Sequence, residues 1–181
     1  MEYRCTTEEL SKIKENLAAG DIIYLTGMVY TSRDAAHKRI FELINRGEEL
    51  PFDIKNAVIY YAGPTATKPG QIIGSCGPTT SGRMDVFAPK LYDMGLLATI
   101  GKGERSKDVI DAIIRNKALY LCAVGGAGAV AAGHIEKAEE IAFYDLGCES
   151  IKRLYIRDFP LFVGIDTKGG DIYKRSRDEG I

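Results

Sequence analysis

The chain has 181 residues, of which 45% are hydrophobic and 27% are charged, and its formal net charge is −1. This length suits a single domain with a proper core, so we expect one domain over residues 1–181, of ordinary globular composition. The balanced charge argues against nucleic acid or a membrane surface as a partner, because no overall field draws the chain to either. An anionic substrate would have to be attracted by a local cluster of cations.

Targeting signals and cysteine motifs are missing from the sequence. No apolar run reaches the roughly 20 residues that span a bilayer, and the first residues lack the apolar stretch of a signal peptide. We therefore expect a cytoplasmic protein. The four cysteines form no Cys-x-x-Cys pair and are expected to be free thiols; they are Cys5, Cys76, Cys122 and Cys148.

The first third of the chain alternates between helical and extended patterns. Thr6 and Glu9 fit a capping box, in which the two side chains satisfy free amides at a helix start. Gly20 and Gly47 stand where helices typically stop. The expected elements are a helix from Thr6 to Ala19, a strand over 21–29, a helix over 32–46 and a strand over 57–62.

The middle of the chain, residues 63–82, is punctuated by glycine and proline, a pattern typical of functional turns. The elements expected afterwards are a helix over 81–94, a strand over 96–100, a helix over 106–116, a strand over 118–124, a short helix over 127–132, a helix or strand over 135–143, and strands over 151–157 and 159–166. Residues 174–181 are polar and expected to be frayed. Little helix separates the late strands, so the pattern predicts an α/β fold with a mixed sheet.

Three segments place a cation beside glycine or a hydroxyl at the edge of an expected element. Arg33 follows a strand directly, Arg83 lies in the first turn of a helix after three hydroxyl residues, and Lys102 stands between two glycines. Unpaired amides at helix starts favour anions, arginine forks grip carboxylates, and lysine acts as a point charge. Around one cleft, these groups would suit a small dicarboxylate.

Each segment taken alone also has a simpler explanation. These explanations are surface ion pairs for Arg33–Asp34 and Arg83–Asp85, a turn with a helix cap for 77–80, a solvated turn for Lys102, and structural roles for His37 and His134. Together the three segments favour an anion site without naming a reaction.

Two nucleotide-binding motifs can be tested against the sequence. Residues 126–131 match Gly-x-Gly-x-x-Ala after an expected strand, and Asp145 follows about 20 residues later, where a ribose-binding acid would stand. The motif belongs to a late strand, however, and close helix–sheet packing explains these glycines equally well. The phosphate-loop pattern fails because Lys102 is followed by Gly103. An NAD-binding oxidoreductase remains an alternative.

Six motifs carry a resemblance that runs in order from about Gly20 to Asp166, nearly the whole chain. They are the segments Ser32–Arg39, Leu50–Asp53, Tyr60–Pro64, Gly77–Asp85, Gly101–Arg105 and Ala123–Ala127. Together they resemble the C-terminal region of class I fumarate hydratases, and equally the β subunits of the two-chain versions and of L-tartrate dehydratase. The most specific motif is Gly-Pro-Thr-Thr-x-x-Arg-Met, at residues 77–84.

The resemblance implies a swivelling β/β/α domain and an iron–sulfur hydro-lyase that reversibly adds water to a double bond. It implies a [4Fe-4S] cluster whose open iron binds substrate, held by a cluster-bearing α subunit in a hetero-oligomer such as α2β2. This chain then supplies no metal ligand. We interpret Cys76 as a packing residue, with shielding of the cluster as the alternative.

Carried over residue by residue, the resemblance assigns roles to nine positions. Arg33, Arg83 and Lys102 would bind substrate carboxylates, while Thr80 and Ser81 would complete the anion pocket. Thr79 would be catalytic, and since a lone threonine is a poor base, an acidic residue of the partner would assist it. Asp34, His37 and Asp85 would support these residues from behind. Ser32 stands where relatives often have glycine.

The resemblance also bears on the substrate. Residues 35–39, 103–105 and 124–127 look closer to fumarases, which favours fumarate and malate. An L-tartrate dehydratase β subunit and a non-catalytic regulatory subunit remain alternatives.

Overall fold

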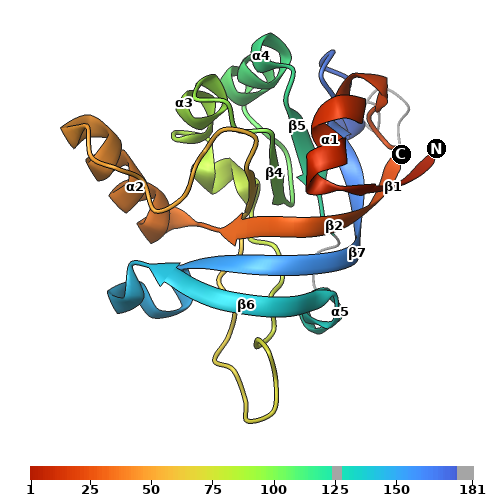
Figure 1. The fold of residues 1–181 in the computed structure, drawn as a ribbon. Helices are drawn as coiled ribbons and strands as arrows, with labels where there is room; N and C mark the ends of the chain where they lie inside the picture. Colours follow the sequence, from red (N-terminus) through yellow and green to blue (C-terminus); the bar gives the residue numbers. More distant parts are fainter. Residues whose placement is uncertain (124–127, 175–181) are drawn as a thin grey trace.

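The computed structural model describes residues 1–123 and 128–174, and expectations for 124–127 and 175–181 lie outside these ranges (Figure 1). The elements in chain order are β1 (Glu2–Thr6), α1 (Thr7–Ile13), η1 (Lys14–Asn16), β2 (Ile22–Thr31), α2 (Asp34–Arg46), β3 (Val58–Tyr60), η2 (Ser81–Met84), α3 (Ala88–Asp93), β4 (Ala98–Gly101), α4 (Lys107–Asn116), β5 (Leu119–Cys122), α5 (Gly128–Gly133), β6 (Ile135–Ala142), η3 (Tyr144–Glu149) and β7 (Ile151–Ile165), where η marks a 3-10 helix.

The strands form one mixed sheet that closes on itself. Strands β2, β3, β4 and β5 are parallel neighbours in that order. Strand β7 pairs antiparallel with both β5 and β2, so the pairings complete a ring. Strand β1 adds to β2 in parallel, and β6 adds to β7 antiparallel. The predicted α/β class with a mixed sheet is confirmed.

Alternation along the strands divides the core into two clusters. Val58 and Tyr60 of β3 belong to one cluster, which also takes in side chains of β2 and β7. Ile59 and Tyr61, which point the other way, pack with buried residues of α2, α3 and α4. These three helices lie together on one side of the sheet in Figure 1. They cover the outer surface of β3 and β4 and bring the start of α2 beside the strand ends.

The predicted capping box is confirmed. The hydroxyl of Thr6 accepts from the Glu9 amide at 3.2 Å, and the Glu9 carboxylate accepts from the Thr6 amide at 2.8 Å. Helix α1 nevertheless ends at Ile13 and continues as the short turn η1, earlier than the predicted end at Ala19. Helix α2 ends as predicted at Gly47, whose φ of 66° is the left-handed conformation that glycine adopts readily.

The predicted helix over 81–94 is wrong as one element. It is split into η2 and α3, with Pro89 in the first turn of α3. In a continuous helix the Pro89 ring would clash with the carbonyl of Asp85, so the chain breaks between the two pieces. No helix in the described part of the chain has the length and apolar character needed to cross a membrane.

The late strands also differ from expectation. The two strands predicted over 151–157 and 159–166 form one continuous strand, β7, which ends at Ile165. Asp158 has a φ of 45° at an irregularity opposite Thr26, and its amide donates to the Thr26 hydroxyl at 3.0 Å. A bulge of this kind interrupts the alternation in sequence without ending the strand. The ambiguous segment 135–143 is a strand, and β1 was not predicted at all.

Candidate functional site

The segments that follow the parallel strands meet at one edge of the sheet, as the carboxyl ends of parallel strands do. The Thr79 amide donates to the Tyr61 carbonyl at 2.7 Å, just after β3. Thr80 forms an isolated parallel bridge with Lys102, and the Ser81 amide donates to the Lys102 carbonyl at 2.9 Å. The main chain of residues 79–81 therefore runs between the ends of β3 and β4.

Arg33 joins this edge from the end of β2. A Cβ built on Gly63 would lie 2.9 Å from the Cδ and from a terminal nitrogen of Arg33. The Arg33 side chain thus lies directly over Gly63, two residues beyond Tyr61, and any larger residue at position 63 would displace it. The Arg33 side chain is 24% exposed, so solvent screens its charge only in part.

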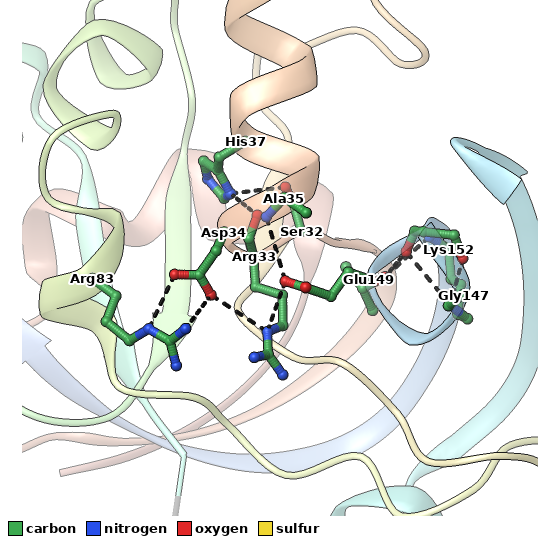
Figure 2. A network of polar contacts seen from close by, with 11 residues as sticks. Ser32, Arg33, Asp34, Ala35, His37, Arg83, Gly147, Glu149 and Lys152 are labelled. Carbon is green, nitrogen blue, oxygen red and sulfur yellow. Dashed lines mark hydrogen bonds and ion pairs between the residues drawn. The ribbon is translucent and has the colours of Figure 1, made fainter. Parts of the chain in front are cut away.

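Asp34 connects the two arginines of the predicted site (Figure 2). Arg83 Nε donates to Asp34 Oδ1 at 3.0 Å, and Arg83 Nη2 forms an ion pair with Asp34 Oδ2 at 2.9 Å. Arg33 Nε lies 3.5 Å from the same Oδ2 and 3.1 Å from Glu149 Oε1. Two cations and two carboxylates, drawn from three separate parts of the chain, form this cluster.

Only some of the guanidinium nitrogens of Arg33 and Arg83 contact carboxylates. A guanidinium has five N–H donors, and the contacts of Arg33 to carboxylates use Nε alone. Those of Arg83 use Nε and Nη2. Within residues 1–123 and 128–174, the terminal nitrogens of Arg33 and Nη1 of Arg83 have no ion-pair partner. These donors remain available to an anion that enters from outside.

His37 supports the start of α2 from the interior. It is fully buried, and its Nδ1 lies 2.9 Å from Ser32 Oγ and 3.0 Å from the Arg33 carbonyl oxygen. A carbonyl can only accept, so Nδ1 carries the hydrogen. Burial lowers the pKa of His37 to about 4, which keeps the ring neutral near pH 7. The ring also packs edge-on against Tyr61, at 5.5 Å between centroids.

Asp85 supports a different arginine from the one predicted. It accepts from Arg105 Nε at 2.7 Å and from the Ser106 amide at 2.6 Å, so the expectation that it pairs with or orients Arg83 is wrong. The Arg105 side chain is fully buried, with its guanidinium over the rings of Tyr61 and Tyr120. The physical reason is the break in the 81–94 helix, which turns Asp85 toward α4.

A tyrosine hydroxyl ties two of the predicted segments together. The Tyr120 oxygen lies 2.8 Å from the Gly103 carbonyl, to which it donates, and 2.9 Å from Ser81 Oγ. Ser81 is buried, Thr79 is half-buried and Thr80 is exposed. The supporting roles of Arg105 and Tyr120 were not predicted from the sequence. Arg105 is the last residue of one of the motifs, but nothing in the sequence indicates that its side chain is buried.

The cysteines of this chain do not fit an iron–sulfur cluster. Cys5, Cys76 and Cys122 are buried, whereas Cys148 is exposed. Burial raises the pKa of Cys5 to about 11 and that of Cys76 to about 12, so these groups stay thiols. The described residues contain no group of three His, Cys, Asp or Glu side chains that could hold a metal ion.

The glycine motif is only partly described, because Gly126 and Ala127 lie outside the described residues. A Cβ on Gly128 would lie 2.2 Å from Ser75 Oγ and 3.1 Å from the Gly77 amide, so glycine is needed there for close packing. The carboxylate of Asp145 is engaged by Arg39 through two hydrogen bonds of 3.0 and 2.5 Å. Neither observation favours a dinucleotide site.

Comparison with known proteins shows which family the chain resembles. Residues 3–176 match the family model described as "Fumarase C-terminus". "Fumarate hydratase 2" of Leishmania major is 38% identical over 92% of the chain, and "Fumarate hydratase class I, anaerobic" of Escherichia coli is 42% identical over 83%. "L(+)-tartrate dehydratase subunit beta" of E. coli is 33% identical over 95% of the chain.

The relatives differ in how much of their own length the chain covers. It spans 30% of the Leishmania protein and 28% of the E. coli fumarate hydratase, but 87% of the tartrate dehydratase subunit.

Proposed function

This chain belongs to the fumarase C-terminus family, and on that premise we propose that it is the substrate-holding subunit of an iron–sulfur hydro-lyase that interconverts fumarate and malate. One observation carries the proposal. Arg33 and Arg83, which lie 50 positions apart in the numbering, share the carboxylate of Asp34 and keep donors unpaired within the described residues. They do so at the edge where Thr79 and Lys102 follow parallel strands.

Three cationic side chains of the site together bind a substrate with two negative charges. The terminal nitrogens of Arg33 and Nη1 of Arg83 bind the substrate carboxylates, and Lys102 adds a point charge. The exposed Thr80 contributes a donor beside Lys102, and the buried Ser81 completes the pocket by holding this segment through the Lys102 carbonyl and Tyr120. Asp34 holds the two guanidinium groups and His37 holds the Arg33 carbonyl, whereas Asp85 holds Arg105. A compact four-carbon dicarboxylate suits this spread of donors.

Thr79 presents the catalytic hydroxyl. Its amide is fixed by the Tyr61 carbonyl, so its position at the strand ends is set by backbone contacts. A threonine hydroxyl is a poor base near neutral pH and needs an activating neighbour. We assign that role to an acidic residue of a partner chain, since the chain spans less than a third of its fumarate hydratase relatives.

The partner chain also holds the [4Fe-4S] cluster that the resemblance implies, because the cysteines of this chain do not fit it. The complex is a hetero-oligomer such as α2β2. Residues 1–181 act in it as one domain, since the ring joins strands β2 to β7.

The test is the activity of the chain combined with its cluster-bearing partner. We expect no hydration of fumarate by this chain alone and measurable hydration by the complex. Thr79→Ala should lower kcat by about 100-fold or more. Arg33→Ala, Arg83→Ala and Lys102→Ala should each lower kcat/KM by about 10- to 100-fold, since each removes a charged hydrogen bond.

Arg115→Ala serves as a matched control, because it removes an arginine that pairs with Asp93 on the surface, at α3 and α4. It should keep kcat/KM within about twofold, as exposed ion pairs contribute little. Full activity in the Thr79, Arg83 and Lys102 variants would contradict the site. A regulatory role without catalysis predicts that outcome.

Tartrate is the second candidate substrate, because the tartrate dehydratase subunit is matched over most of its length. Dehydration of L(+)-tartrate by the same complex, compared with fumarate hydration through kcat/KM, decides between them. A higher kcat/KM for tartrate than for fumarate would make tartrate the substrate, and the proposed roles of the cationic residues would still hold.

A further inference from the structure

Glu149 enters the arginine cluster from a distant part of the chain. It is the last residue of η3, in the connection between β6 and β7. Its Oε1 lies 3.1 Å from Arg33 Nε and accepts the Ala35 amide at 3.3 Å, across 114 positions of sequence. One carboxylate oxygen thus contacts both the side chain of Arg33 and the first turn of α2, as Figure 2 shows.

This contact fixes the direction of the Arg33 guanidinium. Glu149 and Asp34 both approach Nε, and in Figure 2 the two terminal nitrogens point away from both carboxylates. The side chains of Arg33 and Glu149 are 24% and 25% exposed, so their attraction is screened less than that of a surface pair. An arginine held at Nε loses rotamer freedom before any ligand arrives.

The carboxylate also suits its place electrostatically. It lies at the amino-terminal end of α2, where a negative charge is favoured by the helix dipole and a free amide needs an acceptor. Together Glu149 and Asp34 balance the charges of Arg33 and Arg83, which allows two guanidinium groups to share one carboxylate without net repulsion.

We propose that Glu149 is a positioning residue for substrate binding: it aims the terminal nitrogens of Arg33 at the substrate carboxylate and keeps them preorganised. This inference rests on the proposed function of Arg33. It predicts that the geometry of the Glu149 side chain matters more than its charge, because an amide oxygen at the same place can accept the Ala35 amide and still lie beside Arg33 Nε.

The experiment compares three substitutions in the complex with the cluster-bearing partner. Glu149→Ala should raise KM for fumarate about tenfold and change kcat by less than about threefold. Glu149→Gln, which keeps an acceptor within reach, should stay within about threefold of the wild-type KM. Glu149→Asp keeps the charge but shortens the reach, and its KM should resemble that of the alanine variant.

A second readout does not depend on turnover. Calorimetric binding of succinate, an unreactive four-carbon dicarboxylate, should show dissociation constants that rise in the same order as KM. Should the alanine variant fail to fold, the comparison of Glu149→Asp with Glu149→Gln decides the question alone, since both keep a polar group at the start of α2.

Asp145→Ala is the matched control. Asp145 also lies on η3 and also pairs with an arginine of α2, Arg39, but that pair lies on the exposed surface. If Glu149 merely fastened η3 to α2, both alanine variants would lower the melting temperature and leave KM unchanged. An unchanged KM in Glu149→Ala and Glu149→Asp would overturn the inference. A wild-type complex that acts on neither fumarate nor tartrate would instead refute the proposed function.

Discussion

The imidazole of His37 lies beneath the first turn of α2, and its Nδ1 hydrogen is shared between the Arg33 carbonyl and the Ser32 hydroxyl. Its Nε2 is buried without a hydrogen-bond partner among the described residues. Protonation would therefore place an unsatisfied charge in the interior. Burial is the main cause of the low pKa, and the nearby charge of Arg105 lowers it further, whereas the Arg33 carbonyl and Asp34 raise it.

This residue predicts a pH dependence of stability. The pKa of His37 is about 4 in the folded chain, against an ordinary value of 6.5, so the unfolded state binds more protons between these limits. The stabilisation is complete above pH 6.5 and is lost as the pH falls toward 4. Between pH 7 and pH 5 the free energy of unfolding should fall by about 2 kcal/mol more in the wild type than in His37→Asn.

Urea unfolding of both proteins at several pH values measures this difference. Asparagine at position 37 has an amide that can donate to the Arg33 carbonyl but does not titrate, so other ionisable groups cancel in the comparison. Parallel stability curves for the two proteins between pH 7 and pH 5 would show that His37 titrates normally in the folded chain.

At the scale of elements, the packing of η2 against β4 depends on one glycine. A Cβ on Gly101 would lie 1.9 Å from Ser81 Oγ and 3.0 Å from the Tyr61 ring. Gly101→Ala should therefore destabilise the chain by about 1–3 kcal/mol, because η2 and the neighbouring Thr80–Lys102 bridge must shift. Equilibrium unfolding in urea measures the loss.

The structure offers both a rescue and a control for this substitution. Adding Ser81→Gly removes the oxygen that an alanine at position 101 would strike, so the double variant should recover part of the lost stability. Gly133→Ala has no atom within 4 Å of its new Cβ and should change stability by less than about 1 kcal/mol. Equal losses in the two alanine variants would contradict the steric explanation.

The sequence predicted elements well where their ends carry local signals. The capping box of α1 and the terminal glycine of α2 depend on residues a few positions apart, and both are confirmed. The long β7 was predicted as two strands because its bulge at Asp158 is set by the partner strand β2. The helix over 81–94 was overextended, although Pro89 marked the break.

The sequence predicted the cationic residues of the candidate site but not the carboxylates that pair with them. Arg33 and Lys102 follow strands, and parallel order brings strand ends together. Which carboxylate meets which arginine depends on packing. Asp85 turns to the buried Arg105 instead of Arg83, and Glu149 reaches Arg33 across more than one hundred residues. No local spacing encodes either contact.

At the scale of the whole molecule, the ring of strands separates the thiols into two classes. Three cysteines are buried in the two core clusters, on β1, on β5 and in the loop before η2; they are Cys5, Cys122 and Cys76. Cys148, on η3, is exposed. Because β2 and β7 close the ring from opposite ends of the chain, opening the core requires both to separate.

An aromatic disulfide reagent at pH 8 should therefore modify one thiol of the native chain within seconds to minutes and the other three only as fast as the chain unfolds. The raised pKa values of Cys5 and Cys76 slow any direct attack further, since the thiolate is the reactive form. In denaturant all four should react, and Cys148→Ser should abolish the fast phase. Two or more fast thiols in the native chain would mean that part of the ring opens locally, without global unfolding.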